Sequence, residues 1–250
     1  MLRKRFNFTR HWADQMSSGH RYQTPAFFRD KAQEHHDLLR RFADVVEICD
    51  VGCGAGELFS EYQRLGMNVI GIDISPAMIL AAHERNRGSE VRLQCVSDTF
   101  AFLSDCSSDT WVSCGALGQY LSLSDLKALL VLFASNPRVQ TLVLFDCIEP
   151  ARYALYRAGI GALPSSSEYV GATPSPNPRT ARQSLKSYLA RVHIWRIINA
   201  NRSTTIGSAG FAHPARLIKR ITEAADLELS FQCSAHYEYR YHAVFRKNAR

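Results

Sequence analysis

The chain has 250 residues, of which 46% are hydrophobic and 21% are charged, and its net charge is +7. These values are typical of globular proteins, so they exclude disordered, collagen-like and coiled-coil chains. No apolar run approaches the roughly 20 residues that span a bilayer, and polar residues follow the basic start, so we expect neither a membrane helix nor a secretory signal.

The first 150 residues alternate predicted helices with predicted strands. A helix is expected over 24–43, because Thr24 is a suitable N-cap, Pro25 is a suitable first residue, and apolar side chains recur at helical spacing. The chain continues with strands at 45–51, 68–72, 91–95, 110–114 and 139–147 and with helices at 57–65, 75–87 and 124–135. This alternation predicts βαβ units, and hence an α/β fold with a mostly parallel, doubly wound sheet.

After residue 150 the alternation ends. The expected elements are a helix at 151–162, a loop rich in Ser, Pro and Gly at 164–178, a basic amphipathic helix at 180–200, a helix at 214–225, and strands at 227–233 and 237–246. Residues 151–211 are therefore predicted to be a helical insertion after the fifth strand, here called the cap segment. Insertions at this point lie at the carboxyl end of the sheet, where open α/β folds bind ligands.

Charge is divided unevenly along the chain. Residues 42–150 carry a net charge of −8, whereas the cap segment carries +7 with a single acidic residue. Such a segment attracts phosphates, carboxylates or nucleic acid; the alternative is that its arginines are solvated or paired with the acidic part. The seven cysteines lack tight disulfide spacing, and although Cys49 and Cys53 could be a metal pair, no second pair completes a site. We therefore expect reduced thiols, a cytoplasmic protein and no metal site.

A glycine-rich turn follows the first predicted strand. The run Asp50-Val51-Gly52-Cys53-Gly54-Ala55-Gly56 leads from this strand into a helix, and its glycines allow a tight turn and the close approach of a ligand. Asp73 ends the second strand, where a carboxylate is placed to accept hydrogen bonds from a ribose diol. Together these features predict a nucleoside-binding site.

The residue after this turn argues against a dinucleotide. The dinucleotide fingerprint G-x-G-x-x-G requires glycine at position 57, where this chain has Glu57. A glutamate there would repel a pyrophosphate, whereas a cofactor with a sulfonium and no phosphates suits an acidic pocket. A dehydrogenase is therefore disfavoured.

These segments resemble the class I S-adenosylmethionine-dependent methyltransferases. The resemblance rests on residues 48–56 (ICDVGCGAG) and 71–78 (GIDISPAM), and it extends to the fourth strand at 109–117 and the final strand at 237–247. It implies a Rossmann-like sheet with an antiparallel last strand, S-adenosyl-L-methionine as the cofactor, and methyltransferase activity.

The resemblance also implies which residues bind the cofactor. They follow the first four strands and precede the first helix: Asp50, Gly52 and Gly54; Asp73, Ile74 and Met78; Asp98, Thr99 and Phe100; Cys114, Gly115 and Ala116; and Tyr22. In this scheme Asp73 binds the ribose hydroxyls and Asp98 accepts from the adenine amine.

This scheme divides the chain into three parts. Residues 44–150 and 212–250 are expected to form the cofactor-binding domain. Residues 1–43 are expected to form a helical segment over the cofactor cleft, and the cap segment is expected to recognise the substrate.

The sequence says less about the residues that bind and deprotonate the methyl acceptor. Many members of the family carry histidines after the fourth strand, where this chain has Gly118 and Gln119. The predicted catalytic residue is instead His213, just ahead of the last helix, as a general base. Arg182 and Arg191 of the cap segment are the predicted substrate-binding residues.

We therefore expect O-methylation of an anionic or glycan-like small molecule, a saccharide or secondary metabolite, by direct in-line transfer. One alternative is an RNA methyltransferase whose basic segments bind phosphates, although the sequence contains no recognisable RNA-binding module. Another is a non-catalytic partner subunit that keeps the fold, against which the intact glycine turn, Asp73 and Asp98 argue.

Overall fold

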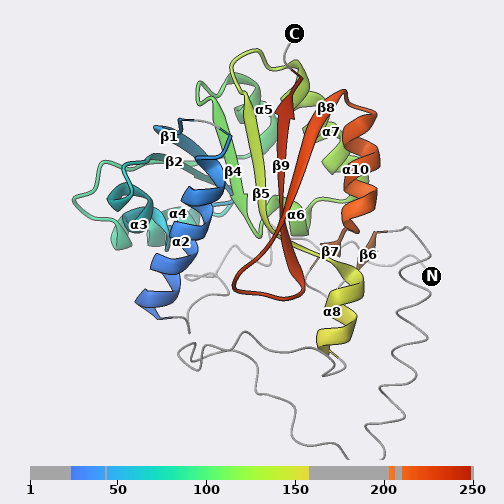
Figure 1. The fold of residues 1–250 in the computed structure, drawn as a ribbon. Coiled ribbons are helices and arrows are strands. Elements are labelled where there is room, and N and C mark those ends of the chain that lie inside the picture. The colour runs from blue at the N-terminus through green and yellow to red at the C-terminus, as the bar shows by residue number, and fades with distance from the viewer. Residues whose placement is uncertain (1–23, 43, 158–202, 206–209, 249–250) are drawn as a thin grey trace, which may run out of the picture.

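The computed structural model describes residues 24–42, 44–157, 203–205 and 210–248. Its centre is a seven-stranded sheet with the strand order β3-β2-β1-β4-β5-β9-β8 (Figure 1). The strands are β1 (Glu47–Val51), β2 (Asn68–Asp73), β3 (Arg92–Cys95), β4 (Thr110–Cys114), β5 (Thr141–Ile148), β8 (Leu227–Cys233) and β9 (Arg240–Lys247).

The sheet is parallel except at β9. β1 pairs in parallel with β2 and β4, and β3 and β5 extend the parallel part on either side. β9 runs antiparallel to both β5 and β8. This arrangement confirms the predicted Rossmann-like sheet with an antiparallel last strand, and it places the carboxyl ends of β1 to β5 along one edge.

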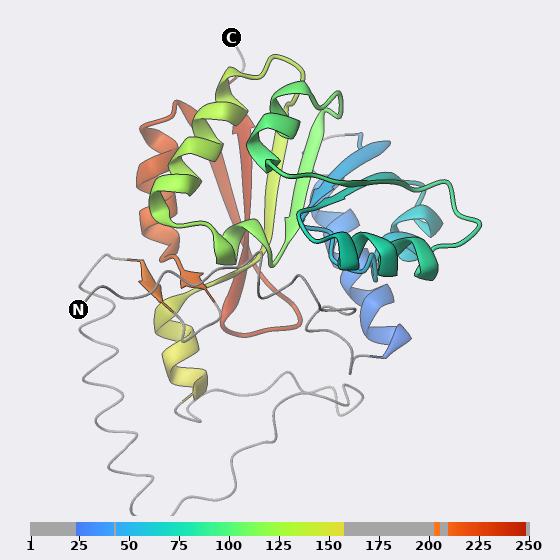
Figure 2. The same cartoon turned by 180° about the vertical axis from the view of Figure 1, so that it is seen from behind.

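Helices cover both faces of the sheet (Figures 1 and 2). On one face lie α2 (Pro25–Leu39), α3 (Phe59–Arg64) and α4 (Pro76–Arg85), and on the other α5 (Thr99–Asp105), α7 (Leu123–Ser135) and α10 (Ala215–Glu223). Two further helices, α6 (Leu117–Tyr120) and α8 (Pro150–Arg157), follow β4 and β5 directly. Both therefore begin at the carboxyl edge.

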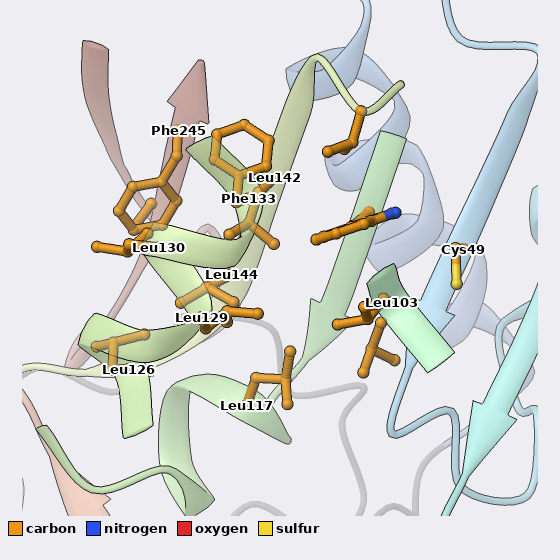
Figure 3. Close-up of a cluster of buried hydrophobic side chains, with 14 of the residues drawn as sticks. Cys49, Leu103, Leu117, Leu126, Leu129, Leu130, Phe133, Leu142, Leu144 and Phe245 are labelled. Atoms are coloured by element: carbon orange, nitrogen blue, oxygen red, sulfur yellow. The ribbon is translucent and has the colours of Figure 1, made fainter. Parts of the chain in front are cut away.

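The larger hydrophobic core lies between the sheet and α7. Figure 3 shows Leu126, Leu129, Leu130 and Phe133 of this helix packed toward side chains of β5 and β9, and all four are fully buried. The capping box of Ser122 and Asp125 fixes where the helix starts. α7 thus holds β5 and β9 together beneath the edge that carries the site.

The structure adds short elements to those predicted. α5, α6 and the two-residue strands β6 (Thr204–Thr205) and β7 (Phe211–Ala212) were not expected. The predicted loop at 164–178 and helix at 180–200 lie outside the described residues. In the part of the chain that the structure describes, the helices are too short or too polar to cross a membrane.

Candidate active site

The glycine turn after β1 is tied to the end of β2. Gly52, Gly54 and Gly56 all have positive φ angles, which glycine adopts without steric cost. The amides of Gly52 and Cys53 donate to the carbonyl of Ile72, at 2.8 and 3.0 Å. The amide of Gly54 donates to Oδ2 of Asp73 at 3.0 Å. The turn and the acid that the sequence singled out therefore form one unit.

A second loop, after β4, packs against this turn. A Cβ on Gly52 would lie only 2.4 Å from the Cβ of Ala116, so the two backbones approach as closely as glycine permits. The hydroxyl of Ser113 donates to the carbonyl of Val51 at 2.7 Å and accepts from the amide of Leu117 at 2.9 Å. Sequence reasoning missed Ser113, because a lone serine in a strand gives no signal of this link.

The predicted cofactor residues gather along the carboxyl edge of the sheet. The partly exposed ones follow β1, β2, β3 and β4: Gly52, Gly54, Asp73, Ile74, Thr99, Phe100, Cys114, Gly115 and Ala116. Asp50 and Met78 belong to the same segments but are buried. The amide of Val96 donates to the carbonyl of Asp73, which brings the chain after β3 beside the end of β2.

Asp98 has a local structural task in addition to the one predicted. It is the N-cap of α5, and its Oδ1 accepts from the amides of Phe100 and Ala101 at 2.9 and 3.1 Å. Its side chain is otherwise exposed. Its contact with the adenine amine stays a prediction.

Asp50 is a buried acidic residue of this edge whose pKa is strongly raised. It is buried, and its Oδ1 has no hydrogen-bond partner among the residues that the structure describes. Burial, together with the neighbouring carboxylates of Asp73 and Glu57, raises the pKa of Asp50 to about 7. An unpartnered acidic oxygen fits a cofactor that brings a sulfonium and an amino group.

Cofactor binding should weaken as the pH falls below about 7, because protonation of Asp50 removes the charge that attracts a cation. Free protein at about pH 6 holds this proton, and a cationic ligand expels it. Titration calorimetry in two buffers of different ionisation enthalpy should therefore detect proton release on binding. Asp50→Asn should abolish the release, and an unchanged proton count in this variant would assign it to another group.

Both ring nitrogens of His213 have hydrogen-bond partners. It is buried, its Nε2 lies 3.0 Å from the carbonyl oxygen of Leu121, and its Nδ1 lies 2.7 Å from Oγ of Ser203. A carbonyl oxygen only accepts, so Nε2 carries the hydrogen and Nδ1 accepts from the serine hydroxyl. Burial lowers the pKa of His213. This arrangement leaves no free lone pair for a substrate, so it does not favour the predicted general base.

Replacing His213 with alanine should lower the free energy of unfolding by about 1–3 kcal/mol, because buried partners lose their hydrogen bonds. His213→Gln keeps a donor for Leu121 and should lose less. Chemical denaturation monitored by circular dichroism measures both. A histidine that serves as the base would behave differently: His213→Gln would keep wild-type stability and lose methyl transfer.

Three predicted residues fall outside the described part of the chain. They are Tyr22 of the N-terminal segment and Arg182 and Arg191 of the cap segment. Of the cap segment, the structure describes the helix α8 and the short strands β6 and β7 with their immediate neighbours. The roles of these three side chains stay predictions.

A family model described as a methyltransferase domain matches residues 48–135. The match spans β1 to α7 and so includes the glycine turn, Asp73, Asp98 and the loop after β4. No curated protein matches the sequence.

Solved structures share the fold. An amino pentose methyltransferase of calicheamicin biosynthesis from Micromonospora echinaspora, with bound SAM, is similar with a TM-score of 0.57 and 18% identity, over 88% of this chain and 92% of that one. Magnesium protoporphyrin IX methyltransferase of Synechocystis PCC 6803, with bound SAH, gives 0.51 and 16%, over 88% and 83%. Residues 48–135 thus match a methyltransferase domain, and the motif and the strand order agree with the fold of class I S-adenosylmethionine-dependent methyltransferases.

Proposed function

We propose that this methyltransferase modifies an oxygen of an anionic or glycan-like small molecule. Cofactor binding at this site is supported mainly by one observation: the glycine turn contacts both Asp73 and the loop after β4. This junction is defined by the hydrogen bond from Gly54 to Asp73 and by the contact of Gly52 with Ala116. This junction holds an acidic, glycine-lined edge in one geometry.

We assign the residues of this edge as follows. Asp73 binds the ribose diol, since each carboxylate oxygen has a second lone pair beyond its backbone hydrogen bond. Asp50 faces the charged end of the cofactor, and the loop at Cys114, Gly115 and Ala116 lines the methionine part. These assignments use the sequence prediction and the shared edge.

Methyl transfer requires the protein mainly to position the cofactor and the acceptor. Bound S-adenosylmethionine would supply an electrophilic methyl group, whose bond to sulfur breaks as the bond to the acceptor oxygen forms, with S-adenosylhomocysteine as the leaving product. The rigid edge fixes the electrophile, and alignment of this kind supplies much of the rate gain. An acceptor hydroxyl must also lose its proton, and the hydrogen bonds of His213 leave that task open to groups nearer β4 and β5.

The substrate class is argued from charge. The cap segment, with its net charge of +7, follows β5 at the carboxyl edge and suits an anionic substrate. The fold neighbours include an amino pentose methyltransferase and an O-methyltransferase family protein, which agree with a small hydroxylated acceptor. We further propose a cytoplasmic location, in keeping with seven unpaired cysteines.

The proposal is tested by incubating the protein with cofactor labelled in the methyl group and with a panel of phenolic acids, uronic acids, neutral sugars and RNA oligonucleotides. Label should move to an acid or a sugar. Arg182→Glu combined with Arg191→Glu should raise KM for the acid and leave the affinity for S-adenosylhomocysteine unchanged. Transfer to RNA alone would overturn the substrate class.

A further inference from the structure

A buried cluster of charged side chains lies at the ends of β4 and β5. Lys31 of α2 forms an ion pair with Asp146 of β5, with 2.5 Å between Nζ and Oδ2, and both side chains are at most 2% exposed. Arg240 of β9 approaches the same oxygen at 3.8 Å, as does Sγ of Cys114. We call Lys31, Asp146 and Arg240 the Lys31 cluster.

The backbone at Asp146 is unusual. Its φ angle is +58°, a left-handed conformation that aspartate adopts only at a cost, and it coincides with an irregularity in the β5–β9 register. Its amide donates to Nδ1 of His242 at 3.1 Å, and Nε2 of His242 lies 3.1 Å from Glu34 of α2. The fold thus holds Asp146 where its carboxylate meets Lys31.

The cluster has unfilled hydrogen-bonding capacity around its two cations. Lys31 and Arg240 share the single carboxylate of Asp146. Oε1 of the nearby Glu34 carboxylate accepts from the amide of Ala235, and its Oε2 lies 3.4 Å from Nε2 of His236. Nε of Arg240 is a buried donor with no hydrogen-bond partner among the described residues, and Oδ1 of Asp146 is a buried acceptor without one. Such groups are rarely left unpaired in a native interior. The donor fits an oxyanion, and the acceptor fits a hydroxyl group of the same ligand.

A metal ion fits this cluster less well than an anion. Atoms of His35, Cys114 and Asp146 lie within 4.8 Å of one another, close enough to share an ion. However, the Lys31 ammonium already contacts the Asp146 carboxylate there. Lys31 and Arg240 already bring two positive charges to this carboxylate, so both would repel a metal ion, whereas both would attract an oxyanion.

Aromatic rings flank the charges. The Arg240 guanidinium lies 4.5 Å from the ring centre of Tyr237 and 5.5 Å from that of Tyr239. Tyr239 in turn contacts Tyr153 and Tyr156 of α8, with ring centres 5.3 and 4.6 Å apart. These four tyrosines are partly exposed. Their faces can stack on an aryl or a sugar ring on the way to the buried charges.

We propose that the Lys31 cluster binds the methyl acceptor, and that this acceptor is a ring compound carrying an oxyanion such as a carboxylate. Lys31 and Arg240 hold the oxyanion, and Asp146 is a positioning residue for Lys31. Cys114 places this site next to Gly115 and Ala116 of the cofactor edge. The inference rests on the proposed function and names the substrate class of that same site.

The test uses protein saturated with S-adenosylhomocysteine and measures binding of benzoate and glucuronate by calorimetry, with benzamide and glucose as uncharged counterparts. At least one acid should bind about tenfold or more tightly than its neutral counterpart, and the pair that shows this identifies the ring as aryl or sugar. Equal affinity, or no binding, of acids and neutral compounds overturns the inference. Failure of S-adenosylhomocysteine itself to bind would instead contradict the proposed function.

Lys31→Met should remove the preference for the acid, but it leaves Asp146 buried beside a more distant Arg240 and risks unfolding. The second variant therefore combines Lys31→Met and Arg240→Met with Asp146→Asn, which removes both cations that hold the oxyanion together with the carboxylate they share. Asparagine tolerates the left-handed backbone at position 146. The matched control is Lys219→Met, which removes an exposed lysine of α10. A folded triple variant that still prefers the acid overturns the inference; loss of the preference, with cofactor-product affinity kept, supports it.

Discussion

Replacing Asp73 with alanine should weaken cofactor binding by about tenfold to a few hundredfold. Hydrogen bonds to a charged group contribute about 1.5–3 kcal/mol each, and every 1.4 kcal/mol is about a factor of ten in affinity. Asp73→Asn should fall between alanine and wild type, nearer to alanine, because both carboxylate oxygens accept from backbone amides, of Gly54 and Ser75. Calorimetric titration with S-adenosylmethionine measures both variants.

The same change should also destabilise the protein, since it releases the glycine turn from β2. We expect a loss of about 1–3 kcal/mol in the free energy of unfolding. Asp125→Ala is the matched control, because it removes the capping-box carboxylate of α7 and leaves the turn intact. A folded Asp73→Ala protein that binds cofactor as wild type does would show that the cofactor lies elsewhere.

Gly52→Ala should reduce kcat/KM by about a hundredfold, because a misplacement of about 1 Å can cost that much in a positioned reaction. Its φ angle of +74° disfavours any side chain, and the new Cβ would lie 2.4 Å from that of Ala116. One of the two loops must therefore move. Binding of S-adenosylhomocysteine and labelled methyl transfer measure the consequence.

Gly66→Ala separates backbone strain from this contact. Gly66 has a φ angle of +83° in the turn after α3, and an added Cβ would meet nothing within 4 Å. It should lose about 1–2 kcal/mol of stability from the left-handed conformation and keep wild-type cofactor affinity. If the two alanine variants lost affinity equally, the approach of Gly52 to Ala116 would not matter for the site.

The fold could be predicted from the sequence because the local signals at the helix ends agree with the helices that form. Thr24 is an N-cap ahead of a proline, as predicted, and Ser75 is another; each accepts a hydrogen bond from its helix. The short helix α6 gave no periodic signal over its four residues. α5 was overlooked because Asp98 was interpreted as a ligand, although aspartate is also a strong N-cap.

The cofactor edge was predictable because its residues follow strand ends in a compact motif. The Lys31 cluster was not, since its members come from α2, β5 and β9 and meet only in the folded sheet. His35 of α2 is likewise buried, and it stacks on Phe145 with ring centres 3.6 Å apart. One signal was available: Phe27, Lys31 and His35 follow one another at intervals of four residues, on the stripe that α2 buries.

The position of β9 has a consequence for how this protein is made. β9 follows β8 in the chain, yet it lies between β5 and β8, and all eight residues of β5 are buried. Until β9 has been synthesised, a growing chain presents β5 with an apolar, unpaired edge, the kind of edge that recruits other chains. β9 also brings Arg240 to Asp146 and His242 to Glu34. A chain interrupted before Arg240 would therefore aggregate, and Glu34 of α2 would lose its contact with His242.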